Sequence, residues 1–154
     1  MESNDETNKK YFKITNEQEN HNGYQYVDGL NVLNMPFAEE GSCVPGGFYF
    51  TDAENILFYL SYGIYLREIS LPETDPDFKM VKDPEDDKWR ANKIILGKRY
   101  NLSDISTFEY LIQQGAEGIS FNYVDNICDY RHPLAGSFPF GSIFSAPPVY
   151  YSFI

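Results

Sequence analysis

Residues 46–60 read GGFYFTDAENILFYL, and this stretch predicts a strand that runs directly into a helix. The aromatic run behind the glycine pair favours a strand. Thr51 and Glu54 have the spacing of a capping box, in which each side chain bonds a backbone N–H at the start of a helix. The apolar residues that follow recur at i, i+3, i+4 and i+7, and they are Ala53, Ile56, Leu57 and Leu60. We therefore expect a helix with one buried face, closed by Gly63.

A second helix is expected between Ser106 and Gly115. Ser106 and Glu109 repeat the capping-box spacing, and Gly115 is a typical helix C-terminal glycine. Its apolar face comprises Ile105, Phe108, Leu111 and Ile112. Residues 88–96 predict a helical start that runs into a strand. Further strands are expected at Tyr11–Thr15, Tyr24–Val27, Leu30–Met35, Ile64–Leu71, Phe78–Val81 and Ile119–Val124, with polar loops over residues 16–23, 36–47 and 73–87.

The composition bounds the fold class. The chain has 154 residues, of which 42% are hydrophobic and 17% aromatic, a balance that favours strands and loops over helical bundles. We expect an α+β fold in a single compact domain, with a mixed or mostly antiparallel sheet, two principal helices and long aromatic-rich loops. Residues 1–10 are expected to be a flexible leader, residues 11–132 the domain, and residues 133–154 a separate tail.

The tail contains no charged residue from Pro133 to Ile154 and is rich in Phe, Tyr, Pro and Gly. Because disordered tails are normally charged and poor in aromatic residues, we expect this one to pack on its own domain or on a partner, and we expect self-association. Trp89 and Arg90 are of the types that anchor interfaces, although Trp89 could equally be a core residue. The candidate interface residues are Trp89, Arg90, Phe138, Phe140, Phe144, Tyr150, Tyr151 and Phe153.

The formal charge of -11 bears on the partners. A phosphate backbone or an anionic membrane surface would be repelled, so we expect neither nucleic acid nor membrane as a partner. A basic protein surface fits better, and a simpler alternative is that the acidity only keeps an aromatic-rich chain in solution. Two cysteines, Cys43 and Cys128, and no signal-peptide pattern predict a reducing, intracellular setting without secretion. No apolar run is long enough to span a bilayer.

Four segments carry a family resemblance, in the order YFKITN (11–16), ENHNGYQYVDGLN (19–31), GGFYFT (46–51) and KWRANKIIL (88–96). Together they resemble the amino-terminal domain found ahead of ankyrin repeats in proteins of mimivirus-type giant viruses, over about residues 11–115. Residues 107–116 are similar to an ankyrin helix ending in Gly-Ala, but no array follows, and one such helix cannot stack. The resemblance implies a viral protein of the infected-cell cytoplasm or the virus particle, and it implies no reaction mechanism.

One enzymatic alternative also comes from a resemblance. ADP-ribosyltransferases use NAD and are similar to this chain in placing a Gly-x-Tyr-x-Thr-like strand before a helix. By that resemblance His21 would hold the ribose, Tyr49 would stack on nicotinamide, and Glu68 would stabilise the oxocarbenium-like transition state. Two departures stand against it: His21 lies in a predicted loop, and Leu66 occupies the position two before Glu68 where these enzymes carry an acid or glutamine.

Other chemistry lacks its residue patterns. The histidines and cysteines are scattered, so we expect no metal site, and no nucleophile elbow, Walker loop or dinucleotide fingerprint occurs. We therefore expect no cofactor and no catalytic residues. The sequence predicts a non-catalytic, self-associating interaction module that binds a host or viral protein. An NAD-using enzyme and a structural particle-associated protein are the alternatives.

Overall fold

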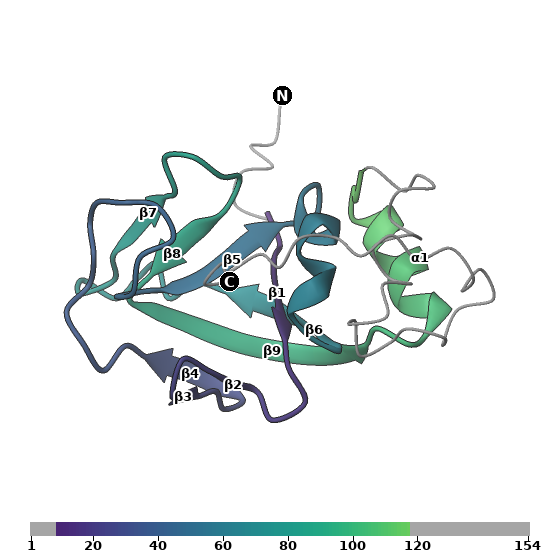
Figure 1. The fold of residues 1–154 in the computed structure, drawn as a ribbon, viewed down its shortest axis with the longest axis horizontal. Coiled ribbons are helices and arrows are strands. Elements are labelled where there is room, and N and C mark those ends of the chain that lie inside the picture. The colour runs from purple at the N-terminus through teal and green to yellow at the C-terminus, as the bar shows by residue number, and fades with distance from the viewer. Residues whose placement is uncertain (1–8, 118–154) are drawn as a thin grey trace.

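The computed structural model describes residues 9–117. In them, five strands precede a first helix, and four more strands precede a second (Figure 1). In chain order they are β1 (Tyr11–Thr15), β2 (Asn20–His21), β3 (Tyr24–Gln25), β4 (Gly29–Val32), β5 (Phe48–Asp52), the 3₁₀ helix η2 (Ile56–Tyr62), β6 (Tyr65–Ser70), β7 (Met80–Lys82), β8 (Trp89–Ala91), β9 (Lys93–Asn101) and the α-helix α1 (Ile105–Gln113).

Seven of these strands form one sheet in the order β4-β9-β6-β1-β5-β8-β7, and β2 and β3 pair separately as a hairpin. Every neighbouring pair in the sheet is antiparallel. In the central strand, Phe12 lies opposite both Thr51 and Glu68, which sets the register across β5, β1 and β6. The prediction of an α+β fold with a mostly antiparallel sheet and two helices is confirmed.

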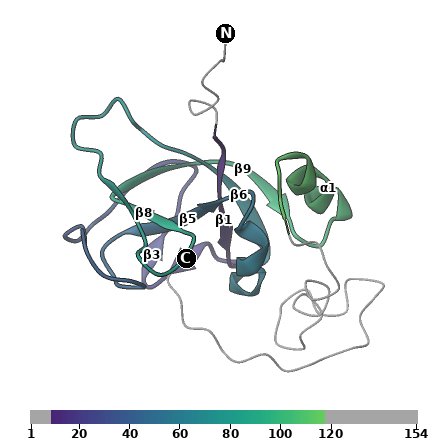
Figure 2. The ribbon, with the colours of Figure 1, turned by 90° about the horizontal axis from the view of Figure 1, so that it is seen from above.

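Hydrophobic clusters cover the sheet on both faces: in β6, for example, Leu66 enters one cluster and Ile69 the other. One cluster joins β1 and β6 to the two helices, which lie next to each other in both views (Figures 1 and 2). Its buried members are Phe12, Ile14, Ala53, Ile56, Leu57, Leu60, Leu66, Leu102 and Leu111. The other lies on the opposite face, beside the β2–β3 hairpin, and comprises Tyr26, Phe48, Phe50, Ile69, Ala91, Ile94 and Leu96.

The start of the first helix differs from the prediction. Thr51 belongs to β5, and its hydroxyl donates to the Asp87 carbonyl oxygen at 2.6 Å, so it does not cap a helix. The chain turns first, with the Asn55 N–H donating to Asp52 Oδ1 at 3.1 Å, and a 3₁₀ helix then begins at Ile56. The predicted apolar stripe is nevertheless buried as expected, because 3₁₀ and α-helical spacing both bring residues three apart to one side.

The second helix is also rotated relative to the prediction. It begins at Ile105, one residue before Ser106, and no side chain caps it. Thr107 and Leu111 are its buried residues, whereas Ile105 and Ile112 are exposed. The Thr107 hydroxyl donates to the Asn101 carbonyl oxygen at 2.7 Å and holds that face against the end of β9. The closing role of Gly115 is confirmed by its left-handed φ of +101°.

Residues 88–96 contain no helix, and this prediction was wrong. β8 and β9 occupy the segment from Trp89 onward, with only Asn92 between them. The Asn92 N–H donates to the Lys79 carbonyl oxygen, and the Asn92 carbonyl oxygen accepts a hydrogen bond from the Leu33 N–H. The strand pattern was missed because Lys88 and Arg90 are both buried, whereas charged residues that flank an aromatic residue in a strand are expected to face solvent.

The remaining predictions have mixed outcomes. Gly63 ends the first helix as predicted, with an extended φ of 173°, and glycine is needed there because a Cβ would lie 2.1 Å from the Thr15 carbonyl oxygen. The predicted loop over residues 16–23 contains β2. The strand predicted at Ile119–Val124 and the tail over residues 133–154 lie outside the described residues. Within residues 9–117, no helix is long and apolar enough to cross a membrane.

Candidate functional site

The three residues of the ADP-ribosyltransferase resemblance each have separate partners. His21, on β2, accepts a hydrogen bond at Nε2 from the Asn16 N–H at 3.1 Å. Burial, followed by the charge of Lys13, lowers the pKa of His21 to about 3, so this imidazole is neutral. The Tyr49 hydroxyl donates to the Val44 carbonyl oxygen at 2.6 Å.

Glu68, on β6, is held by tyrosines of the helix-covered face. Its carboxylate accepts hydrogen bonds from the hydroxyls of Tyr100, at 2.9 Å, and of Tyr110. Those two rings stack with their centroids 4.9 Å apart. Glu68 therefore orients the packing of α1 on the sheet.

The sheet itself separates His21 from Glu68. Phe12, the partner of Glu68, lies in the helix-side cluster, whereas the next residue, Lys13, points to the hairpin side. There the Lys13 ammonium lies 5.1 Å from the centre of the Tyr26 ring, against which His21 packs edge-on at 5.8 Å. The three predicted residues thus do not converge on one cleft.

Tyr49 is also inaccessible, with 1% of its surface exposed. Its ring lies 4.9 Å from the Lys88 ammonium and 5.7 Å from the Arg90 guanidinium. A nicotinamide ring could stack there only if these cations moved away. The geometry therefore gives no support to the NAD-binding alternative.

Arg90 is a core residue, so its predicted role as an interface anchor does not fit the structure. Its side chain is fully buried, and Nε donates to the Ala38 carbonyl oxygen at 2.7 Å while Nη1 donates to that of Gly41 at 3.0 Å. It therefore holds the long loop between β4 and β5 against β8. Sequence reasoning missed this role because a lone arginine in a strand normally points to solvent.

Trp89 is half-buried. Its ring packs edge-on against Tyr11, with ring centres 5.6 Å apart, and the Lys9 ammonium lies 4.9 Å from its centre. Trp89 therefore belongs to the margin of the hairpin-side core, as the alternative to an interface anchor foresaw. The remaining predicted interface residues lie outside the described residues, and they are Phe138, Phe140, Phe144, Tyr150, Tyr151 and Phe153.

A network of buried charges crosses the hairpin side of the sheet. Glu19 accepts two hydrogen bonds from Arg67, at 2.7 and 2.6 Å, and one each from Thr15 and Arg99. Burial alone would raise the pKa of Glu19, but the hydrogen bonds from Arg67 and Thr15 outweigh it and lower the pKa. Asp28 lies 2.8 Å from Arg67 on the other side. The network joins the β2–β3 region to the sheet, and no spacing in the sequence pointed to it.

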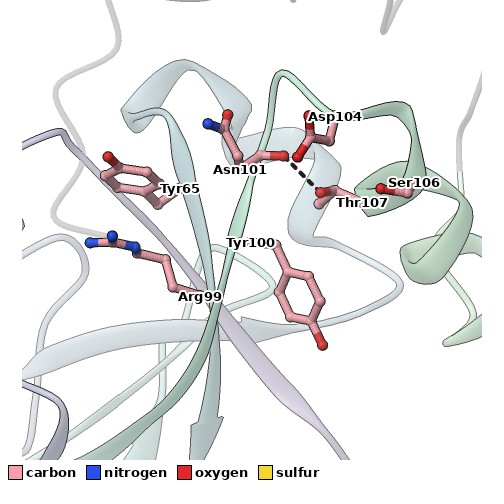
Figure 3. Close-up of a pocket in the computed structure, with 7 residues that line it drawn as sticks. All are labelled: Tyr65, Arg99, Tyr100, Asn101, Asp104, Ser106 and Thr107. Atoms are coloured by element: carbon pink, nitrogen blue, oxygen red, sulfur yellow. Dashed lines mark hydrogen bonds between the residues drawn. The ribbon is translucent and has the colours of Figure 1, made fainter.

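The described residues contain a cavity of about 420 Å³ at the junction of β9 and α1 (Figure 3). Its lining residues are Tyr65, Arg99, Tyr100, Asn101, Asp104, Ser106 and Thr107. The Arg99 guanidinium lies 4.3 Å from the centre of the Tyr65 ring, and Tyr65 and Arg99 lie across from Asp104 and Ser106 in the view. The lining carries charges of both signs, Arg99, which is bonded to Glu19, and Asp104.

Four apolar side chains around β4 are exposed, and we call them the β4 strip. They are Val27 (52% exposed), Leu30 (51%), Val32 (47%) and Met35 (47%). β4 is an edge strand of the sheet, and Leu30 and Val32 flank the buried Asn31, which bonds the backbone of Val27 and Gly29. Asn31 therefore fixes this segment so that its apolar side chains face solvent.

Within residues 9–117, no group of three or more His, Cys, Asp or Glu side chains is arranged to hold a metal ion. The strongest candidate surface in the described part of the chain is therefore the β4 strip, which carries no reactive group.

Several curated proteins of Acanthamoeba polyphaga mimivirus are similar to this chain. "Putative ankyrin repeat protein R229" is 48% identical over 128 residues, which are 76% of this chain and 42% of that protein. "Putative ankyrin repeat protein R868" is 50% identical over 109 residues, 70% of this chain and 54% of that protein. "Uncharacterized protein R869" is 50% identical over 111 residues, 71% of this chain and 80% of that protein.

The chain thus spans about half the length of the two relatives named for ankyrin repeats and most of the third. No protein-family model and no solved structure matches the chain.

Proposed function

This chain belongs to a family of mimivirus proteins, several of them named for ankyrin repeats, and we propose on that basis that it is a non-catalytic protein-interaction module. The observation that supports the proposal is the β4 strip, in which Leu30 and Val32 lie about half exposed on an edge strand, and Val27 and Met35, equally exposed, lie within three residues of its ends. Exposed apolar groups that gather on one edge are typical of interaction surfaces, whereas scattered ones are not.

The occupant we propose for the β4 strip is a second copy of the chain. The whole chain carries a charge of -11, so two copies repel each other over most of their surfaces. Residues 29–38 contain no charged residue, and Asp28, the one charged residue between Val27 and Met35, is paired with Arg67, so like-charge repulsion is expected to be weak along the strip. A two-fold contact would also bring the same apolar side chains of both copies together.

The strength of such a contact follows from the area available. Completing the burial of a half-exposed valine or leucine contributes on the order of 1 kcal/mol, and a two-fold contact uses each side chain twice. These contributions sum to about 8 kcal/mol, and an association cost of at least about 4 kcal/mol leaves a dissociation constant of roughly millimolar. Self-association is therefore expected to depend on concentration.

The test is the solution mass of the full chain over a range of concentrations, measured by size exclusion with light scattering. The wild type should approach a dimer as concentration rises, and the double variant Leu30→Ser/Val32→Ser should remain a monomer. Ile105→Ser/Ile112→Ser is the matched control, because these α1 residues are also 59% and 50% exposed, and it should dimerise like the wild type.

The uncharged tail is tested separately. Tyr150→Ser/Tyr151→Ser should leave the dimer intact if the β4 strip mediates it. A dimer that is lost only in this tail variant would move the interface away from β4. A wild type that is monomeric at every concentration would overturn self-association and leave a different protein, host or viral, as the partner.

The place of action that we propose is the cytoplasm of the infected cell or the virus particle. It rests on the viral relatives alone. Fractionation of infected cells and of purified particles, followed by detection of the chain in each fraction, tests this proposal.

A further inference from the structure

Cys43 and Lys88 meet at the base of the long loop between β4 and β5. The Lys88 side chain is fully buried, and its Nζ lies 2.9 Å from Cys43 Sγ although the residues are 45 positions apart. Cys43 itself is only partly buried. The mechanism of an interaction module makes no use of this pair.

Asp83 holds both residues in place. Its carboxylate accepts hydrogen bonds from the Cys43 N–H at 3.1 Å and from the Ser42 hydroxyl at 2.7 Å. Its own N–H donates to the Lys88 carbonyl oxygen at 2.9 Å. Because one buried residue fixes the backbone on both sides, the sulfur and the nitrogen are held in contact before any reaction.

Asp86 completes the group. Its Oδ2 lies 3.5 Å from Lys88 Nζ and 3.6 Å from Cys43 Sγ. A carboxylate in this position can receive the proton that an ammonium must lose before its nitrogen can form a new bond. The Tyr49 ring lies 4.9 Å from the same nitrogen and closes the site from the side of the sheet.

We propose that Cys43 and Lys88 form a reversible covalent S–O–N crosslink when dioxygen oxidises them. In the balanced step, one thiol, one neutral amine and one dioxygen give the crosslink and one water. The S–H bond and one N–H bond break, and an S–O bond and an O–N bond form through one oxygen atom. Sulfur and nitrogen each lose two electrons, dioxygen gains four, and the two hydrogens leave with the second oxygen as water.

The charged groups around Lys88 determine the pH at which the crosslink should form. Burial lowers the pKa of Lys88, but the Cys43 sulfur and the Asp86 and Asp83 carboxylates outweigh it and raise the pKa. The neutral amine is therefore the minor form near neutral pH, and the crosslink should form faster in alkaline solution. Once formed, it ties the loop to β8 alongside the hydrogen bonds of Arg90.

The decisive measurement is the intact mass of the full chain after exposure to air, made on a Cys128→Ser background so that the other thiol cannot react. The crosslink adds one oxygen and removes two hydrogens, an increase of about 14 Da that a thiol reductant reverses. Peptide mapping should then find the Cys43 and Lys88 peptides joined. Cys43→Ser and Lys88→Arg should abolish the increase, and Lys82→Arg, at an exposed lysine of β7, should not.

Other outcomes would overturn the proposal. Additions of one, two or three whole oxygen atoms at Cys43, with Lys88 unmodified, would mean ordinary thiol oxidation. An unchanged mass after prolonged exposure at alkaline pH would mean that the pair does not react. Because the measurement is made on a chain with both residues intact, it does not depend on whether the Lys88 variant folds.

Discussion

Arg67 and Glu19 form a doubly hydrogen-bonded pair beneath the β2–β3 hairpin, although 48 positions separate them. Arg67 Nε lies 2.7 Å from one carboxylate oxygen and Nη2 lies 2.6 Å from the other, and both side chains are buried. Arg67 also donates to the Gly97 carbonyl oxygen at 2.8 Å. The pair thus joins the segment before β2 to β6 and β9 at one point.

Removing one partner of this pair should be costly. Glu19→Gln removes the buried counter-charge of the Arg67 guanidinium and leaves it only the exposed Asp28 carboxylate, and we expect the free energy of unfolding to fall by about 3 kcal/mol. Urea denaturation followed by circular dichroism measures this. Glu39→Gln is the control, because Glu39 pairs with Lys79 at 3.6 Å in an exposed position and should change little. Equal losses in both variants would contradict the assigned role of Glu19.

Lys13 should make stability depend on pH. Burial, and then the charge of Lys88, lower the pKa of Lys13 to about 7, whereas an unfolded lysine titrates near 10.4. Between these values the unfolded state binds the extra proton, so the free energy of unfolding should rise with pH from 7 toward 10. From pH 7 to pH 9 the rise should be on the order of 2 kcal/mol.

The Lys13→Met variant isolates this effect. It has no amine to titrate, and its free energy of unfolding should lack the rise that Lys13 adds to the wild type. Urea denaturation of both proteins at pH 7, 8 and 9 makes the comparison. Parallel curves for the two proteins would mean that Lys13 is protonated in the folded state throughout.

Gly63→Ala should destabilise the chain more than Gly23→Ala. A Cβ at Gly63 would lie 2.1 Å from the Thr15 carbonyl oxygen, a backbone atom that cannot move without shifting β1. Gly23 has a φ of +81° but open space around it, so its alanine variant carries only the backbone strain of roughly 1 kcal/mol. Thermal unfolding of both variants tests the order, and a larger loss in Gly23→Ala would contradict it.

Calorimetric titration with NAD should give no saturable heat. The physical reason is that Tyr49 is buried against Lys88 and Arg90, while His21 and Glu68 lie on opposite sides of the sheet. The same preparation should show a folded circular dichroism spectrum as the control. Saturable binding that Glu68→Gln weakens would restore the enzymatic alternative.

The β1 strand illustrates how far local pattern carries. The sequence predicted Tyr11–Thr15, and the structure places β1 at those residues, because β-branched and aromatic residues favour an extended chain. The stripe of η2 was equally predictable, since its apolar spacing requires one buried side. The bounds of the helices were not, because the Thr51 hydroxyl donates to the distant Asp87 carbonyl oxygen instead of capping a helix, and α1 begins before Ser106, the cap that was expected.

The fold class, the sheet-rich character and the likeness to the viral family could be predicted from local propensity and from matching segments. The buried positions of four charged residues become visible only in the folded chain, because residues of these types normally lie in solvent; they are Lys13, Glu19, Lys88 and Arg90. Each has a hydrogen-bond partner between 36 and 52 positions away in the chain, which lowers the cost of its burial. Such partners come together only when the sheet has formed, so no local pattern records them.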